Sequence, residues 1–252
     1  MSSMPQIQRA AFVNDSIDRV SNVREINADF HVPVSVETKV VEWHASSTIG
    51  NKKCFERIER NKSRMTMLAQ LPAGRPFKKF GHDEDVEFFV LSGVFSDSDG
   101  DYGAGSYVRN PAGTNHEPFT GDGCTVLFKL GQFQPLDRKR IVIDTKNSPI
   151  RWLPVGEPGV SRLALHHFSE EDIYLYRIRT ECWITFKHES HGLELFICEG
   201  AISVKGNRYV VGDWLRYPAG SKVKVSAIGD VCLYVKKCIF PTTKITTTCN
   251  RI

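Results

Sequence analysis

The apolar and polar positions of this chain form short runs that favour strands over helices. The segments FFVLSGVFS and LFICEGAISV combine aromatic and β-branched residues and are bounded by Gly, Asp and Asn. SDSDGD and KGN, which lie between consecutive runs, are typical of hairpin turns, and NPAGT and YPAGS place Pro and Gly at a further turn. Many short strands separated by turns predict an all-β sandwich or barrel.

This pattern occurs twice in the chain. Residues 87–114 align with residues 194–221 at a constant offset of 107, without a gap. The matched residues include Glu87 and Glu194, Arg109 and Arg216, Pro111 and Pro218, and Lys129 and Lys236. An ungapped repeat of this length predicts two similar domains of about 110 residues each.

The repeat sets the expected domain organisation. We expect residues 1–30 to form a polar N-terminal extension, packed on a domain or exchanged with a partner. Residues 31–142 should form a first barrel and residues 143–240 a second, because the apolar strand RIVID gives way to polar residues between them. Residues 241–252 are polar and are expected to form a C-terminal tail.

Composition narrows the class of protein. Hydrophobic residues make up 41% and charged residues 25%, which is typical of a globular chain and excludes wholesale disorder or a coiled coil. The net charge of +4 is too small to argue for binding to nucleic acid or membrane. The apolar runs are too short for a membrane span, and no secretory signal is evident. The seven cysteines form no CxxC pair, so we expect reduced thiols in a cytoplasmic protein.

The segment FSDSDGDYGAGSYVRNPAGTNHEPFTGDGCTVLFKLGQF resembles the ChrR-type cupin domain of anti-sigma factors and of acetylacetone and dihydroxyacetophenone dioxygenases. The resemblance is close over residues 67–134 and weaker over residues 163–237. It implies two tandem double-stranded β-helix (jelly-roll) barrels. In typical members it also implies a divalent metal in each barrel, held by three His and one Glu.

In the first repeat the resemblance assigns two of these ligands, His82 and His116. The position of the family Glu holds Val86, and Glu87 follows one residue later. A one-residue shift turns a side chain to the opposite face of a strand unless a bulge re-aims it. We therefore expect a metal at His82, Glu87 and His116, with the acidic residues 83–85 as alternative donors. The opposing interpretation is that both histidines are ordinary barrel residues.

The second repeat departs further from the family pattern. The four ligand positions hold Lys187, Glu189, Leu193 and Val223. A cation and two aliphatic side chains cannot ligate a metal, so we expect a degenerate second barrel that supports the first.

Other candidates favour structural roles. Arg109 and Arg216 precede the PAG turn in both halves, and we expect them to bond turn carbonyls or Asp side chains. The pair His166 and His167 has no motif around it and is expected at the surface or rim.

Three functions are consistent with these residues. The first is a non-haem Fe(II)-dependent dioxygenase that cleaves a C–C bond of a small diketone or hydroxyketone, with Zn or Ni as alternative metals. The second is a metal-free bicupin that binds a small molecule or regulates without catalysis. A purely structural bicupin is a third. By resemblance we also expect a homodimer.

Overall fold

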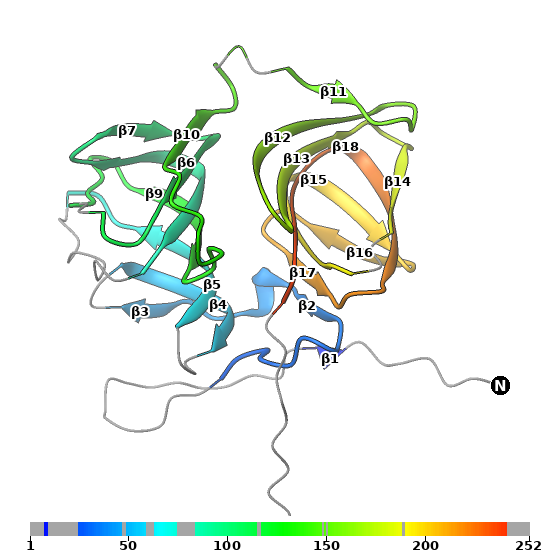
Figure 1. Ribbon diagram of the computed structural model, residues 1–252, viewed down its shortest axis with the longest axis horizontal. Helices are drawn as coiled ribbons and strands as arrows, with labels where there is room; N and C mark the ends of the chain where they lie inside the picture. Colours follow the sequence, from blue (N-terminus) through cyan, green and yellow to red (C-terminus); the bar gives the residue numbers. More distant parts are fainter. Residues whose placement is uncertain are drawn as a thin grey trace, which may run out of the picture.

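The computed structural model describes residues 8–9, 25–46, 49–58, 63–74, 84–114, 117–147, 149, 151–187 and 190–240. These residues form strands and one short 3-10 helix, η1 (Thr38–Val40), and contain no α-helix, so the all-β prediction is confirmed. Nothing helical in this part of the chain has the length and apolarity to cross a membrane. Figure 1 shows two barrels side by side, the first in cyan and green and the second in yellow and orange.

The first barrel is an eight-stranded sheet in the order β10-β8-β6-β9-β5-β4-β3, with β7 paired to β6. Its strands are β3 (His44–Ser46), β4 (Gly50–Ile58), β5 (Arg64–Leu71), β6 (Val86–Asp97), β7 (Gly100–Gly103), β8 (Ser106–Asn110), β9 (Cys124–Leu130) and β10 (Ile141–Asp144). All of these pairings are antiparallel.

The second barrel is a ten-stranded sheet in the order β1-β2-β17-β15-β18-β13-β12-β11, with β14 paired to β18 and β16 to β15. Its strands are β1 (Gln8–Arg9), β2 (Val34–Val36), β11 (Leu153–Pro154), β12 (Val160–Phe168), β13 (Glu171–Ile178), β14 (Trp183–Lys187), β15 (Gly192–Val204), β16 (Asn207–Val210), β17 (Trp214–Tyr217) and β18 (Lys222–Cys238). The two barrels together form the bicupin arrangement that the repeat predicted.

The two halves exchange their first strands. β2, which begins the first repeat, pairs with β17 of the second barrel. β10, which begins the second repeat, pairs with β8 of the first barrel. Val34 and Ile141 are 107 residues apart and pair with the equivalent residues Arg216 and Arg109. The exchange is therefore reciprocal, and each barrel is completed by a strand of the other repeat.

Successive side chains of the central strands lie alternately in the interior of their own barrel and in the contact between the two barrels. In β6, Phe88 and Val90 point into the first barrel, whose interior is a cluster of apolar side chains. Phe89, one residue away, packs instead in a second cluster that contains residues of both barrels. β15 repeats this pattern, with Leu195 inside the second barrel and Phe196 between the barrels. Since side chains alternate between the faces of a strand, every central strand contributes one face to its own barrel and one to the contact between barrels.

Candidate functional site

The described interior of the first barrel is aromatic and apolar. Phe88 lies at its centre, with ring centroids 4.7 Å from Phe95, 5.6 Å from Phe128 and 5.8 Å from Tyr102. All four side chains are buried. These rings form an apolar wall on the inner face of the first barrel.

The three predicted metal ligands are not brought together by the described residues. His82 and His116 both lie outside the described part of the chain. Glu87 is described and is 1% exposed, but it lies on the face of β6 opposite to Phe88, between the barrels. The ligand set His82, Glu87 and His116 therefore stays a prediction.

The Glu87 carboxylate is held by cations. Its Oε2 accepts hydrogen bonds from Arg109 Nη1 at 2.8 Å and from Lys236 Nζ at 3.0 Å, and its Oε1 accepts one from the Tyr234 hydroxyl. Burial by itself would raise the pKa of Glu87, but Lys236, Arg109 and Lys129 outweigh it and lower the pKa to about 2. The carboxylate is ionised and fully bonded in this position.

Glu87 belongs to a row of side chains that crosses the first sheet. Cross-strand pairing aligns Glu87 with Arg109 on one side and with Lys129 on the other. The row continues through Thr66 to Glu56, which a bulge in β4 brings into line. Because laterally paired residues point to the same face, the whole row lies on the side turned to the second barrel.

The second barrel carries the equivalent row. It consists of Arg216, Glu194, Lys236, Ile173 and His166. A bulge in β12 brings His166 into line, as the bulge in β4 does for Glu56.

The two rows meet face to face and exchange ion pairs. Glu87 pairs with Lys236, and reciprocally Glu194 pairs with Lys129. All four side chains are at most 2% exposed. The pKa of Glu194, like that of Glu87, is lowered to about 2, by Lys129, Arg64 and Lys236 acting against burial. This reciprocity matches the reciprocal exchange of β2 and β10 between the barrels.

We define two clusters within this contact. The Arg109 network consists of Glu87, Arg109, Asp137, His166, Glu171 and Lys236. The Arg216 network consists of Glu56, Arg64, Lys129, Glu194 and Arg216.

Both arginines are structural, as the sequence predicted. Arg109 donates to Asp137 Oδ2 at 2.7 Å and to Glu171 Oε1 at 2.8 Å. Arg216 donates to Glu56 Oε2 at 2.5 Å and to the carbonyl of Asp29 at 2.7 Å. An Asp side chain and a loop carbonyl are thus among their acceptors.

The expectation for His166 was wrong. His166 is only 6% exposed and hydrogen-bonds Asp137 through Nε2 at 2.7 Å, whereas the neighbouring His167 is exposed and pairs with Asp172. Alternation along β12 explains the difference, because adjacent residues face opposite sides. Burial and then the nearby Arg109 lower the pKa of His166, so this imidazole is neutral at pH 7.

Asp137, His166 and Glu171 form the one group among the described residues whose donor atoms are close enough to hold a metal, within 4.8 Å of one another. The donors are already engaged, because Arg109 bonds both carboxylates and Lys236 lies 3.2 Å from Glu171 Oε2. A dication here would sit beside a guanidinium and an ammonium. The group therefore fits an ion-pair network better than a metal site.

In the second barrel, two of the former ligand positions are apolar. Leu193 is 0% and Val223 is 1% exposed, and both belong to the apolar core of this barrel. Lys187 is exposed at the end of β14, and Glu189 lies outside the described residues.

The sequence missed Glu56, Asp137 and Glu171 as members of the contact. A signal was present in Glu87, Arg109 and Lys129, which are charged, lie in otherwise apolar strands and recur at the offset of 107. Charged residues repeated inside strands indicate a buried polar contact.

Comparisons with known proteins support the fold. Residues 31–134 match the family described as ChrR Cupin-like domain, so the resemblance found in the sequence is confirmed over that range. No match was found among curated proteins.

Three solved structures illustrate the similarity. A candidate dioxygenase from Nostoc punctiforme is 15% identical with a TM-score of 0.65, covering 83% of each chain. The pirin YhhW from Escherichia coli, in complex with nickel(II), is 11% identical with a TM-score of 0.62, covering 82% of this chain and 99% of its own. An oxalate decarboxylase from Lactobacillus farciminis, in a formate complex, is 11% identical with a TM-score of 0.59, covering 88% of each chain. At these identities the similarity shows the fold alone.

Proposed function

Because residues 31–134 match the ChrR Cupin-like domain, we propose that this protein is a bicupin whose first barrel binds a divalent metal and a small ketone-type substrate. The observation that carries the proposal is the aromatic interior of the first barrel. The segment that contains His82 leads into β6 at Val86, and the segment that contains His116 follows β8 at Asn110. Val86 and Asn110 are paired, so both segments connect to the same end of the barrel.

A bound Fe(II), Zn(II) or Ni(II) ion would supply Lewis acidity and, for Fe(II), oxygen activation. We propose that His82 and His116 hold this metal through imidazole nitrogens. Phe88, Phe95 and Phe128 then provide an apolar wall for the carbon skeleton of a diketone or hydroxyketone, and they exclude water from it. The resemblance to diketone-cleaving cupins supports this substrate class, and the description of the Nostoc protein as a dioxygenase supports the type of reaction but names no substrate.

Glu87 is proposed as the third ligand, and its contacts set a condition on that role. It can join a metal in the first barrel only if its bonds to Arg109 and Lys236 are broken. The substitution Glu87→Gln separates the two roles. Loss of metal from a protein of unchanged stability would support ligation. Unchanged metal content with reduced stability would assign Glu87 to the contact between the barrels, and the ion pairs favour this second outcome.

The metal itself is tested by loading the protein with Fe(II) without oxygen and measuring metal content and oxygen uptake with acetylacetone. We expect His82→Ala and His116→Ala to lose the metal and the oxygen uptake. The exposed His167→Ala is the matched control and should retain both. Unchanged metal in both of the first two variants would remove the proposal. Loss confined to His166→Ala would instead place the metal at Asp137, His166 and Glu171.

A metal-free bicupin that binds a small molecule is the second candidate. It is favoured by the apolar described interiors of both barrels. Thermal stabilisation of the protein by a diketone in the presence of a chelator would support it over the metal-dependent reaction.

A further inference from the structure

A slot opens in the wall of the second barrel, away from the first barrel and from the contact between them. It encloses about 580 Å³, which is within the range of sites for small molecules. β14 and β13 both pair with β18, at different parts of its length, and among the described strands they do not pair with each other. The slot lies where this pairing is missing. It is lined by Val155, Glu157, Arg162, Tyr176, Trp183, Ile184, Thr185, Phe186, Lys187, Lys222 and Lys237.

The floor of the slot is apolar and aromatic. Tyr176, Ile184 and Phe186 are at most 8% exposed and belong to the core of the second barrel. Tyr176 and Phe186 meet edge to face, with ring centroids 5.3 Å apart. A flat apolar group can rest on this floor without burying an unpaired polar atom.

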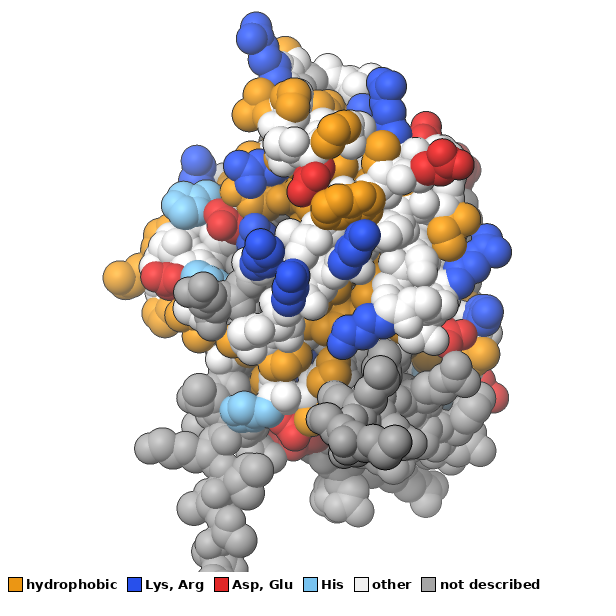
Figure 2. Space-filling model, turned by 90° about the vertical axis from the view of Figure 1, so that its right-hand side faces the viewer, with side chains coloured by type: hydrophobic (Ala, Val, Ile, Leu, Met, Phe, Trp, Pro, Cys, Tyr) orange, Lys and Arg blue, Asp and Glu red, His pale blue; other side chains and the backbone are white. Residues whose placement is uncertain are grey.

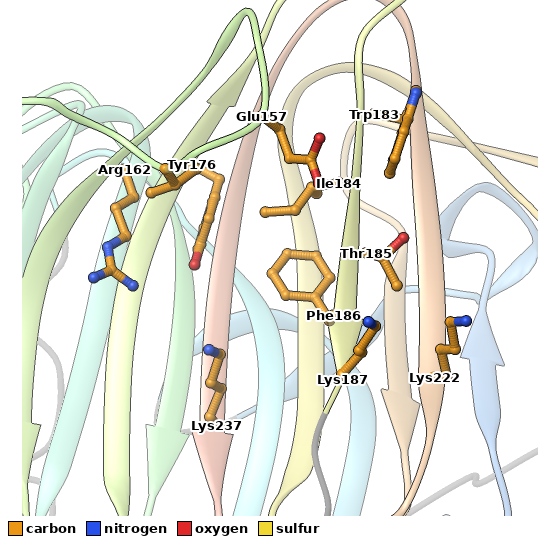
Figure 3. Close-up of a pocket in the computed structure, with 11 residues that line it drawn as sticks. Glu157, Arg162, Tyr176, Trp183, Ile184, Thr185, Phe186, Lys187, Lys222 and Lys237 are labelled. Atoms are coloured by element: carbon orange, nitrogen blue, oxygen red, sulfur yellow. The ribbon is translucent and has the colours of Figure 1, made fainter.

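Positive charge surrounds the floor. Figure 3 shows Arg162 and Lys237 on one side of Phe186 and Lys187 and Lys222 on the other. In Figure 2, which looks onto the second barrel, several Lys and Arg side chains gather around hydrophobic ones. The lining contains four cations and a single carboxylate, that of Glu157.

These cations have no carboxylate partners among the described residues. Lys187 and Lys222 are directly opposite each other on paired strands, an arrangement that is unfavourable without a counter-charge. Arg162 is directly opposite Tyr176 on the paired strands β12 and β13, and it lies over the ring of Tyr174, 4.6 Å from its centroid. Asp172 acts on Arg162 and Lys237, so the repulsion that a bound anion would relieve most directly is that between Lys187 and Lys222.

Lys237 is the most confined of the four. It is half-buried, and burial lowers the pKa of its ammonium group, although Asp172, directly opposite on β13, acts in the other direction. The nearest acidic side chain that acts on it, Asp172, is hydrogen-bonded to His167 at 2.8 Å.

We propose that this slot binds a small organic anion, a carboxylate or phosphate joined to a flat apolar body. The anionic group would lie among Arg162, Lys187, Lys222 and Lys237, with the body against Tyr176 and Phe186. Four cations disfavour the binding of a metal ion, so the slot is a site of a different kind from the one proposed for the first barrel.

Calorimetric titration of the chelator-treated protein tests the proposal with benzoate and phenyl phosphate. We expect both to bind, and two further compounds separate the contribution of the charge from that of the ring. Benzylamine carries the same ring with a positive charge, and inorganic phosphate carries the charge without a ring. Each should bind at least about tenfold more weakly.

Variants locate the binding. Lys187→Gln and Lys222→Gln, on the exposed rim, should keep the fold and together weaken phenyl phosphate binding about tenfold or more. Arg162→Gln should act in the same direction, whereas Arg208→Gln, which removes a charge from β16 outside the slot, should not. His82→Ala should leave the binding unchanged, which keeps this result independent of the first barrel.

Several results would overturn the proposal. They are the absence of binding by both aromatic anions, equal binding of benzylamine, equal binding of inorganic phosphate, or an equal effect of Arg208→Gln. Binding of a poly-glutamate peptide without binding of benzoate or phenyl phosphate would assign the charge to a macromolecular partner instead.

Discussion

The Arg109 and Arg216 networks occupy equivalent places in the two repeats but contain different charges. Acidic side chains outnumber Arg and Lys by one around Arg109, and Arg and Lys outnumber acidic side chains by one around Arg216. The two excesses cancel. Positions 64 and 171 show the divergence directly, because they are 107 residues apart and hold Arg and Glu.

Charge in this molecule is balanced across the contact between the two barrels. Four of the ion pairs among the described residues of the two networks join one barrel to the other: Arg64 to Glu194, Arg109 to Glu171, Lys129 to Glu194, and Lys236 to Glu87. A barrel separated from its partner would leave such groups buried without a counter-charge or exposed to water. The barrel interiors, by contrast, are apolar in both halves and do not depend on the partner. One face of each central strand thus packs in the interior of its own barrel, and the opposite face forms the contact between the two barrels.

Substitution of Arg109 or Arg216 should give the largest effect on the stability of the folded protein. Arg109→Met leaves Glu87, Asp137 and Glu171 with only Lys236 to balance them, whereas Arg216→Met leaves a network with equal numbers of acids and cations. We expect Arg109→Met to lower the free energy of unfolding by about 3–5 kcal/mol and Arg216→Met to lower it by less. Urea denaturation at pH 7 measures both. An equal or larger loss for Arg216→Met would show that charge balance does not distinguish the networks.

Acidification should affect the equivalent glutamates alike. Glu87 and Glu194 have a pKa of about 2 in the folded protein, below the ordinary value of 4.5. A depressed folded pKa contributes stability that is complete above about pH 4.5 and is lost as the pH falls towards 2. We expect Glu87→Gln and Glu194→Gln each to flatten the dependence of unfolding free energy on pH in this window. Exposed Glu199→Gln is the control, and a change in only one of the two variants would break the equivalence.

The adjacent residues His166 and His167 should differ in a smaller effect, the dependence of stability on pH near neutrality. His166 is buried with a lowered pKa, so the unfolded chain takes up a proton there first, and stability should fall as the pH drops below about 6.5. His166→Gln should remove that fall and cost about 1 kcal/mol at pH 7. The corresponding substitution at exposed His167 should change stability by less than about 1 kcal/mol and leave the pH dependence intact. Unfolding curves between pH 5 and 8 distinguish the two.

The sequence by itself determined the two-barrel architecture. The ungapped repeat from Glu87 to Lys129 preserves strand alternation and turn residues, and these local signals are sufficient because each strand buries one face in its own barrel. The same repeat also contains charged residues of the contact between the barrels, although the sequence alone did not show that they form ion pairs there.

Only the tertiary structure decided which charges meet. Glu56 and His166 occupy equivalent places in the two sheets, but they are 110 residues apart. The connection between β4 and β5 is three residues longer than the connection between β12 and β13. The constant offset of 107 therefore could not match these two residues. Bulges in β4 and β12 turn the side chains of Glu56 and His166 towards the contact between the barrels. The exchange of β2 and β10 joins each repeat to the other barrel. Ion pairs between residues more than a hundred positions apart depend on how the two barrels dock, and no local pattern along the chain records that geometry.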